Sequence, residues 1–206
     1  MENIDFTYLA VVFGSILISM TLHEAMHAFM GHWLGDDTAK LQGRLTLNPL
    51  AHIDPFTTVL LPLMLVLIGA PPFGAAKPVP FNPYKVKFGE YGAALVGLAG
   101  PLTNFVLAAL AGLAVHLLPV GPDLGAILRV FAIVNISFFV FNMIPFPPLD
   151  GSRVLYAFAP DAVRSFMERI EAMGFMAIIF FMLLFYALLI DPFIRIVNFF
   201  ITFLVG

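Results

Sequence analysis

The stretch TLHEAMHAF places two histidines and a glutamate close together, at His23, Glu24 and His27. Side chains four residues apart lie on the same face of an α-helix, so both imidazoles can bind one metal ion. Glu24 follows the first histidine directly and can reach a water held by that ion. The spacing therefore predicts a catalytic zinc site in which His23 and His27 bind the metal and Glu24 is the base that activates the water.

The surrounding sequence is too apolar for a soluble protein. Hydrophobic residues make up 61% of the 206-residue chain and charged residues 11%, whereas soluble domains are about 25% charged. We therefore expect an integral protein of the lipid bilayer, and the formal net charge of −3 indicates no nucleic-acid partner. Ionisable groups inside a membrane span are usually functional. That favours a metal site over two histidines placed together by chance.

The chain has no cysteine, so histidines and carboxylates must supply every ligand of a transition metal. We expect the third ligand to be Asp150, in FNMIPFPPLDG. The prolines before it end a predicted helix and leave irregular backbone, which is tolerated at membrane depth only against protein or a water-filled cavity. The alternative is a simple helix stop with Asp150 in a surface turn.

Apolar segments predict the fold. Two of them, Thr57–Ala70 and Phe193–Val205, are short for a span and are expected to be re-entrant or to cross a thinned bilayer. Two connecting segments, Arg44–Leu47 and Val79–Phe88, predict short strands at the membrane surface. The longer segments, expected to cross, are Phe6–Trp33, Tyr91–Leu118, Ala126–Ile144 and Gly174–Ile190. The predicted fold class is an all-α polytopic membrane protein, one domain over residues 1–206, with about five to six transmembrane or re-entrant helices and short membrane-surface β-strands.

Basic residues predict the orientation. The N-terminus, MENIDF, has no basic segment typical of a cleaved signal, so the first span is expected to be retained. By the positive-inside rule, three connecting regions are cytoplasmic and the N-terminus lies outside. The first span then ends inside after His27, and Ala126–Ile144 returns Asp150 to the same side. The basic residues of these regions are Lys40, Arg44, Lys77, Lys85, Lys87, Arg153, Arg164 and Arg169.

Together, TLHEAMHAF and NMIPFPPLDG resemble the site-2 protease family of intramembrane zinc metalloproteases. GRLTLNPLAHIDP, AKPVPFNP and AGPLTNF resemble its compact branch, without PDZ or CBS domains, so the likeness runs from about Ser15 to Arg153. The resemblance implies a Zn²⁺ ion bound by the residues His23, His27 and Asp150, with Glu24 as the catalytic base.

The resemblance also assigns a role to Asn142, which matches the asparagine that contacts the substrate backbone in that family. An amide there is also a reasonable donor to a developing oxyanion, and a hydrogen bond between helices is the alternative. The family often has a tryptophan before AKPV, where this chain has Ala75. At this position the loop departs from the family pattern.

The predicted function is an intramembrane zinc endopeptidase that hydrolyses peptide bonds in or near transmembrane segments, as in regulated intramembrane proteolysis. The expected partner is a membrane-protein substrate with an unwound transmembrane segment, which the predicted strands could accept by strand addition. Solvated connectors are the alternative for those strands. The expected location is a prokaryotic plasma membrane, with the active site toward the cytoplasmic side. A membrane metal-ion transporter and a catalytically inactive scaffold relative are the alternative functions; the scarcity of further ligands and the intact Glu24 count against them.

Two further polar residues have predicted roles. Asn104 lies mid-span in GPLTNF, near Gly97 and Gly100. Small residues let helices approach closely and an amide can hydrogen-bond across them, so packing is favoured and substrate binding in the active-site wall is the alternative. His52 is expected to cap a hairpin or shape the site and not to bind the metal.

Overall fold

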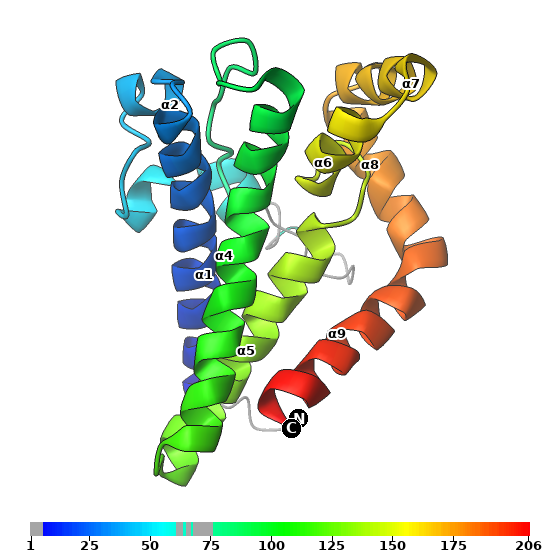
Figure 1. Cartoon of the computed structure of the whole chain (residues 1–206). Coiled ribbons are helices and arrows are strands. Elements are labelled where there is room, and N and C mark those ends of the chain that lie inside the picture. The colour runs from blue at the N-terminus through cyan, green and yellow to red at the C-terminus, as the bar shows by residue number, and fades with distance from the viewer. Residues whose placement is uncertain (1–5, 61–63, 65–66, 68–75) are drawn as a thin grey trace.

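The computed structural model describes residues 6–60, 64, 67 and 76–206, and within them four helical segments are long and apolar enough to cross a membrane. Helix α4 packs against both α1 and α5, and α9 crosses their lower half beside α4 and α5 (Figure 1). The segments are α1 (Phe6–Trp33), α4 (Gly89–Leu117), α5 (Pro122–Asn142) and the run Phe175–Val205, which comprises α8 (Phe175–Leu184), the π-helical η3 (Phe185–Leu189) and α9 (Ile190–Val205). The prediction of an all-helical chain with several possible membrane spans is therefore confirmed for the described residues.

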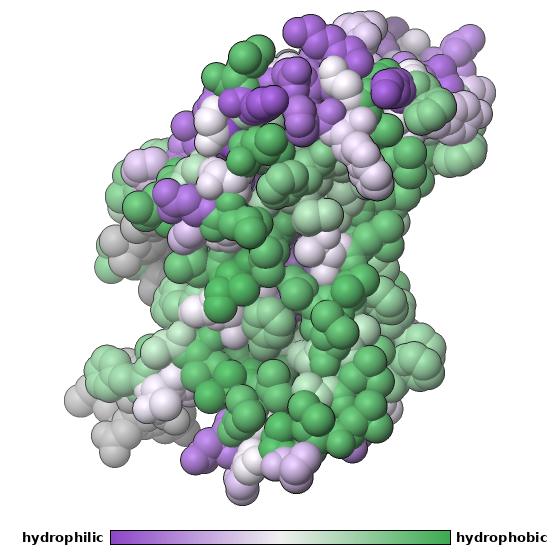
Figure 2. Space-filling view, turned by 60° about the vertical axis from the view of Figure 1, so that its left-hand side comes forward, coloured by the Kyte–Doolittle hydropathy of each residue, from purple (hydrophilic) through white to green (hydrophobic). Residues whose placement is uncertain are grey.

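Shorter elements lie between these long segments. Helices α2 (Thr38–Leu41), α6 (Gly151–Phe158) and α7 (Asp161–Ala172) lie at the upper end of the bundle in Figure 1, and η1 (Pro49–Ala51) and η2 (Pro55–Leu60) lie in the connection that follows α2. Figure 2 shows hydrophilic side chains gathered at this upper end, above a broad belt of hydrophobic ones. This division is what a bilayer imposes on a polytopic protein, because exposed side chains in the hydrocarbon must be apolar.

The two predicted β-strands are wrong: neither Arg44–Leu47 nor the segment Val79–Phe88 is a strand. The prolines at positions 78, 80 and 83 remove backbone donors that a strand ladder needs. The donors that are left bond elsewhere: the Asn82 N–H donates to the Asp36 carboxylate at 2.6 Å, and the Lys87 N–H to the Leu34 carbonyl at 2.8 Å. These contacts tie the segment to the end of α1 as an irregular loop.

The expected count of five to six transmembrane or re-entrant helices is also not supported. Gly174–Ile190 and Phe193–Val205 were expected as separate elements, but they form one continuous helical run. Pro192 follows the π-helical turn η3, where the backbone hydrogen-bond pattern changes, so its missing N–H does not end the run. The expectation for Thr57–Ala70 falls largely outside the described residues; its described start belongs to η2.

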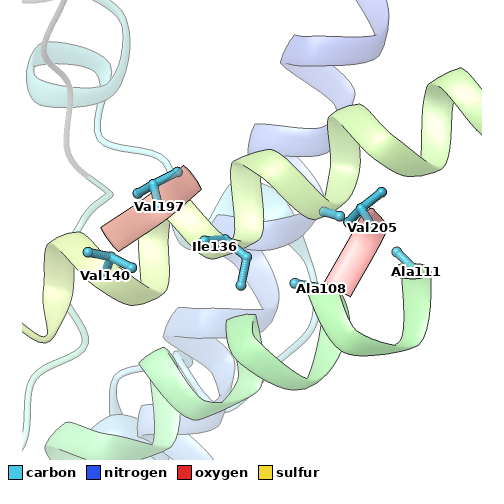
Figure 3. Packing of buried hydrophobic residues seen from close by; sticks show 7 residues of the cluster. Ala108, Ala111, Ile136, Val140, Val197 and Val205 are labelled. Atoms are coloured by element: carbon cyan, nitrogen blue, oxygen red, sulfur yellow. The ribbon is translucent and has the colours of Figure 1, made fainter. Parts of the chain in front are cut away.

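Small side chains hold α4, α5 and α9 close together (Figure 3). A Cβ on Gly112 of α4 would lie 2.2 Å from the carbonyl oxygen of Leu204 on α9, so only glycine permits this crossing. The buried cluster comprises Ala108, Ala111, Ala132, Ile136, Val140, Val197 and Val205. Its packing fixes α4 and α5 relative to each other, and these two helices position the polar groups described next.

Candidate metal centre

Three donor atoms from two distant parts of the chain meet at the upper half of the bundle. Nε2 of His23 lies 3.0 Å from Nε2 of His27, and Oδ2 of Asp150 lies 3.1 Å from the first and 3.3 Å from the second. Ligand atoms about 2.0–2.1 Å from a tetrahedral zinc ion are about 3.3 Å apart. The triangle therefore fits a single zinc ion. Among the described residues these three form the one cluster of histidine and acidic side chains that could hold a metal.

In both histidines the nitrogen that faces away from the centre, Nδ1, is hydrogen-bonded to an acceptor. Nδ1 of His27 lies 2.6 Å from the carbonyl oxygen of Val96, and Nδ1 of His23 lies 2.6 Å from Oδ1 of Asn104. A carbonyl oxygen only accepts, so each Nδ1 carries the proton and donates it. Each Nε2 is then left with a lone pair facing the other. Two lone pairs 3.0 Å apart repel unless a metal ion or a shared proton lies between them, and a metal ion would also bind the Asp150 oxygen beside them, which favours a metal site.

Gly100 of α4 leaves room for the centre. A Cβ built at this position would lie 2.4 Å from Nε2 of His27 and 2.7 Å from Nε2 of His23. Both distances are far below van der Waals contact, so any side chain here would displace the imidazoles or occupy the metal's place. Glycine inside a helix costs up to about 1 kcal/mol of helix stability relative to alanine. Here the missing Cβ leaves the ligand atoms unobstructed.

The chain between α5 and α6 folds back to bring Asp150 to this depth. The prolines at positions 145, 147 and 148 cannot continue α5, which ends at Asn142. A Cβ on Gly151 would lie 2.4 Å from the Met143 carbonyl oxygen, so glycine lets the loop pack against the end of α5.

His27 and His23 lie six and ten residues before the end of α1 at Trp33, or about 9 and 15 Å at 1.5 Å per residue. The centre is thus sunk below the hydrophilic end.

Glu24 lies beside the centre and faces the irregular loop after residue 76. Its Oε2 accepts a hydrogen bond from the backbone N–H of Val79 at 3.0 Å. Arg44 holds the same loop by donating from Nη2 to the Lys77 carbonyl oxygen and, at 3.4 Å, to that of Pro78. Burial lowers the pKa of the Arg44 guanidinium, and the nearby Glu24 carboxylate opposes that effect. The sequence indicated Arg44 only as a topology signal and a strand residue, because nothing in its neighbourhood points to residue 77.

Other residues with predicted roles lie around the centre or away from it. Asn104 is fully buried and bonds across helices to α1 and α5, the arrangement expected of a packing amide. Asn142 donates from Nδ2 to the Phe138 carbonyl of its own helix at 3.0 Å. His52 is fully buried, and its Nε2 lies 2.9 Å from the Thr46 carbonyl, so it closes the loop between α2 and η2. Ala75 lies outside the described residues.

Two contributors to the centre were missed at the sequence level. The Val96 carbonyl carries no side-chain signal, so nothing in the sequence could identify it. Asn135 is fully buried and bonds to Asn104. Its signal was present, because Asn135 precedes Asn142 by seven residues and therefore lies on nearly the same face of α5.

Comparison with known sequences agrees with this geometry. The model of Peptidase family M50 matches residues 120–186. "Putative zinc metalloprotease YwhC" of Bacillus subtilis (strain 168) is 37% identical over 170 residues, covering 78% of this chain and 74% of that protein. "Putative zinc metalloprotease Rip2" of Mycobacterium tuberculosis (strain ATCC 25618 / H37Rv) is 31% identical over 147 residues, covering 70% of this chain and 56% of that protein. No solved structure matches.

Proposed function

Because this chain belongs to Peptidase family M50, the site-2 protease family of metalloproteases, we propose that it is an intramembrane zinc endopeptidase. Its substrates are membrane proteins, cut within or near a transmembrane segment. The observation that carries the proposal is the triangle of donor atoms, with sides of 3.0, 3.1 and 3.3 Å, that joins α1 to the start of α6. Its depth below the hydrophilic end supports cleavage within the membrane.

The zinc ligands in this proposal are Nε2 of His23, Nε2 of His27 and a carboxylate oxygen of Asp150. Three protein ligands are the number found in catalytic zinc sites, which keep a further position open. When bound, zinc supplies a Lewis acid that polarises a carbonyl oxygen and lowers the pKa of water to about 7. The Val96 and Asn104 oxygens hold the two rings in the orientation that this role requires.

Glu24 serves as the general base and then as the general acid. It accepts the proton of the attacking water at its carboxylate and donates it to the leaving amine nitrogen. Its place directly after His23 on α1 puts the carboxylate beside the ligands. The Val79 N–H bond restrains that carboxylate from the side of the loop. A glutamine here keeps the shape and loses the ability to accept the proton.

Asn142 contacts the substrate backbone in this proposal. Its amide nitrogen has two hydrogens, and one of them is used in the bond to the Phe138 carbonyl. The second can donate to a substrate carbonyl oxygen. The bond within α5 then holds the amide in position, which reduces the entropy lost when the substrate binds.

The substrate itself must present an unwound segment, because a helix shields its own peptide bonds. The loop that crosses Glu24 at Val79 is irregular and carries backbone carbonyl oxygens fixed by Arg44. This loop contacts the base and can exchange backbone hydrogen bonds with an unwound peptide. In the cell, we propose a prokaryotic plasma membrane, with the N-terminus outside and the hydrophilic end in the cytoplasm.

The test compares wild type with Glu24→Gln on a panel of single-span substrates, with zinc content measured on the same samples. We expect Glu24→Gln to keep its zinc and lose cleavage, since the ligands are untouched and the base is gone. Glu90→Gln, at an exposed glutamate in the first turn of α4, is the matched control and should cleave normally. Normal cleavage by purified Glu24→Gln would refute the mechanism. Zinc without cleavage of any substrate by wild type would refute the endopeptidase assignment.

A further inference from the structure

Behind His23 runs a chain of hydrogen bonds that starts at a backbone carbonyl of α5. Nδ2 of Asn135 donates to the Phe131 carbonyl oxygen at 2.9 Å, and Oδ1 of Asn135 accepts from Nδ2 of Asn104 at 2.9 Å. Oδ1 of Asn104 then accepts from Nδ1 of His23 at 2.6 Å. Both asparagines are fully buried, so no water competes for these bonds. These bonds join α1, α4 and α5, and in each of them the donor lies on the side of His23 and the acceptor on the side of Phe131.

The direction is set by the first acceptor. The Phe131 carbonyl can only accept, so Asn135 must turn Nδ2 toward it and Oδ1 toward Asn104. Asn104 must then turn Nδ2 toward Asn135, a direction in which the Ser19 carbonyl at 3.3 Å also accepts. Only Oδ1 of Asn104 is left for His23. The imidazole therefore carries its proton on Nδ1 and has a free lone pair on Nε2.

His27 needs no such device. Its Nδ1 donates directly to the Val96 carbonyl, which is part of the backbone of α4 and cannot turn round. The partner of His23 is instead a side-chain amide with a donor end and an acceptor end. If Asn104 flipped, Nδ2 would face His23, and the ring would need its proton on Nε2, where it blocks metal binding.

We propose that Asn135 is a positioning residue that, with the longer contact from Asn104 to the Ser19 carbonyl, keeps Asn104 from flipping and thereby fixes the metal-binding tautomer of His23. The inference rests on the metal centre of the proposed function, but it is independent of which substrate is cut. Outer-shell partners of metal-ligating histidines typically contribute a factor of about 10–100 to metal affinity. Asn135 acts through one further residue, so its effect is expected toward the lower end of that range.

The first experiment measures zinc affinity by competition with a chromophoric chelator. Asn135→Leu is close in size and removes the acceptor, and we expect its zinc Kd to rise by about tenfold or more. Ser137→Ala is the matched control on α5, because Ser137 donates only to the Ile133 carbonyl of the same helix. It should bind zinc as wild type does. An unchanged Kd in a folded Asn135→Leu protein overturns the proposal.

A second variant separates positioning from packing. Asn104→Asp has an acceptor at both ends, so its orientation no longer matters to His23. Zinc affinity in the Asn104→Asp background should therefore not fall when Asn135→Leu is added. A loss of similar size in both backgrounds would show that Asn135 only packs the helices and would overturn the proposal.

Histidine tautomers in the metal-free protein give a readout that does not depend on zinc. With ¹⁵N-labelled histidine at a pH where the rings are neutral, wild type should show His23 protonated on Nδ1. Asn135→Leu should show a mixture or the Nε2 form, and a wild-type ring protonated on Nε2 would overturn the proposal even if the variant fails to fold. A wild-type protein that bound no zinc would refute the metal centre, while the tautomer would still report whether Asn135 acts on His23.

Discussion

Oδ2 of Asp150 lies 3.1 Å from Nε2 of His23, although the two residues are 127 positions apart in the sequence. The contact joins the middle of α1 to the loop after α5. It forms because α4 brings α1 and α5 together and because the loop after α5 folds back on Gly151.

Replacing Asp150 by alanine should remove a ligand and lower both zinc content and cleavage. Metal that binds only the folded protein also raises its thermal stability by mass action. We therefore expect a chelator to lower the Tm of wild type and to have little effect on Asp150→Ala. Zinc analysis and thermal unfolding in detergent check this. An unchanged zinc stoichiometry would remove Asp150 from the ligand set.

Replacing Gly100 by alanine should abolish zinc binding without unfolding the helix. Alanine favours helix by up to about 1 kcal/mol over glycine, but its Cβ would lie 2.4 Å from Nε2 of His27. Gly14→Ala is the control, because a Cβ at Gly14 of α1 meets nothing within 4 Å. Zinc content and helical circular dichroism of both variants provide the test. Full zinc binding by Gly100→Ala would show that the centre has more space than its geometry allows.

Single cysteines in this cysteine-free chain can report which end of the bundle is cytoplasmic. We expect Lys40→Cys and Lys85→Cys to react with an impermeant thiol reagent only after the cell interior is opened. A cysteine in place of Gly121, in the turn between α4 and α5, should react from outside. Labelling of the first two positions from outside alone would reverse the proposed orientation.

Asp36 should stabilise the loop that reaches Glu24. Its carboxylate is buried and accepts from the backbone N–H groups of Asn82 and Thr38 at 2.6 and 3.0 Å. Asparagine would turn a donor toward one of these donors, so Asp36→Asn should lower stability by about 1–3 kcal/mol. Thermal unfolding and hydrogen exchange at the Asn82 amide measure this. Asp37→Asn, at the exposed neighbour paired with His32, should change stability little.

The same residue gives a prediction for pH. Burial raises the pKa of Asp36, but hydrogen bonds from Thr38 and from the Asn82 backbone outweigh it, and the pKa lies below its usual value. A carboxylate with a lowered folded pKa stabilises the protein above the unfolded pKa of about 3.9 and loses that contribution as pH falls through the folded value. The difference between wild type and Asp36→Asn should therefore be constant near neutral pH and shrink in acid. A difference that grows in acid would contradict this sign.

Predictions from the sequence were wrong where the local structure depends on a contact with a residue that is distant in the sequence. Alternation at Arg44–Leu47 indicated a strand, yet Arg44 is buried and Leu47 exposed, because the guanidinium reaches the Lys77 carbonyl from another part of the chain. Asp191 and Pro192 indicated a break, but the π-helical turn η3 before them changes the backbone hydrogen-bond pattern and the helical run continues through Pro192. Both predictions used local sequence patterns, whereas the structure at these positions depends on backbone hydrogen bonds outside the pattern.

The sequence by itself determined that this is an apolar, predominantly helical chain with His23, Glu24 and His27 on one helix. Helical periodicity and the cost of burying charge in lipid require no knowledge of the partners. Only the tertiary structure decided which groups surround the two rings: the Val96 carbonyl and Asn104 bond to them, Gly100 leaves the space, and Asn135 bonds to Asn104. The physical reason is that hydrogen-bond direction and close packing are properties of facing helices, and a single helix encodes only its own half of each contact.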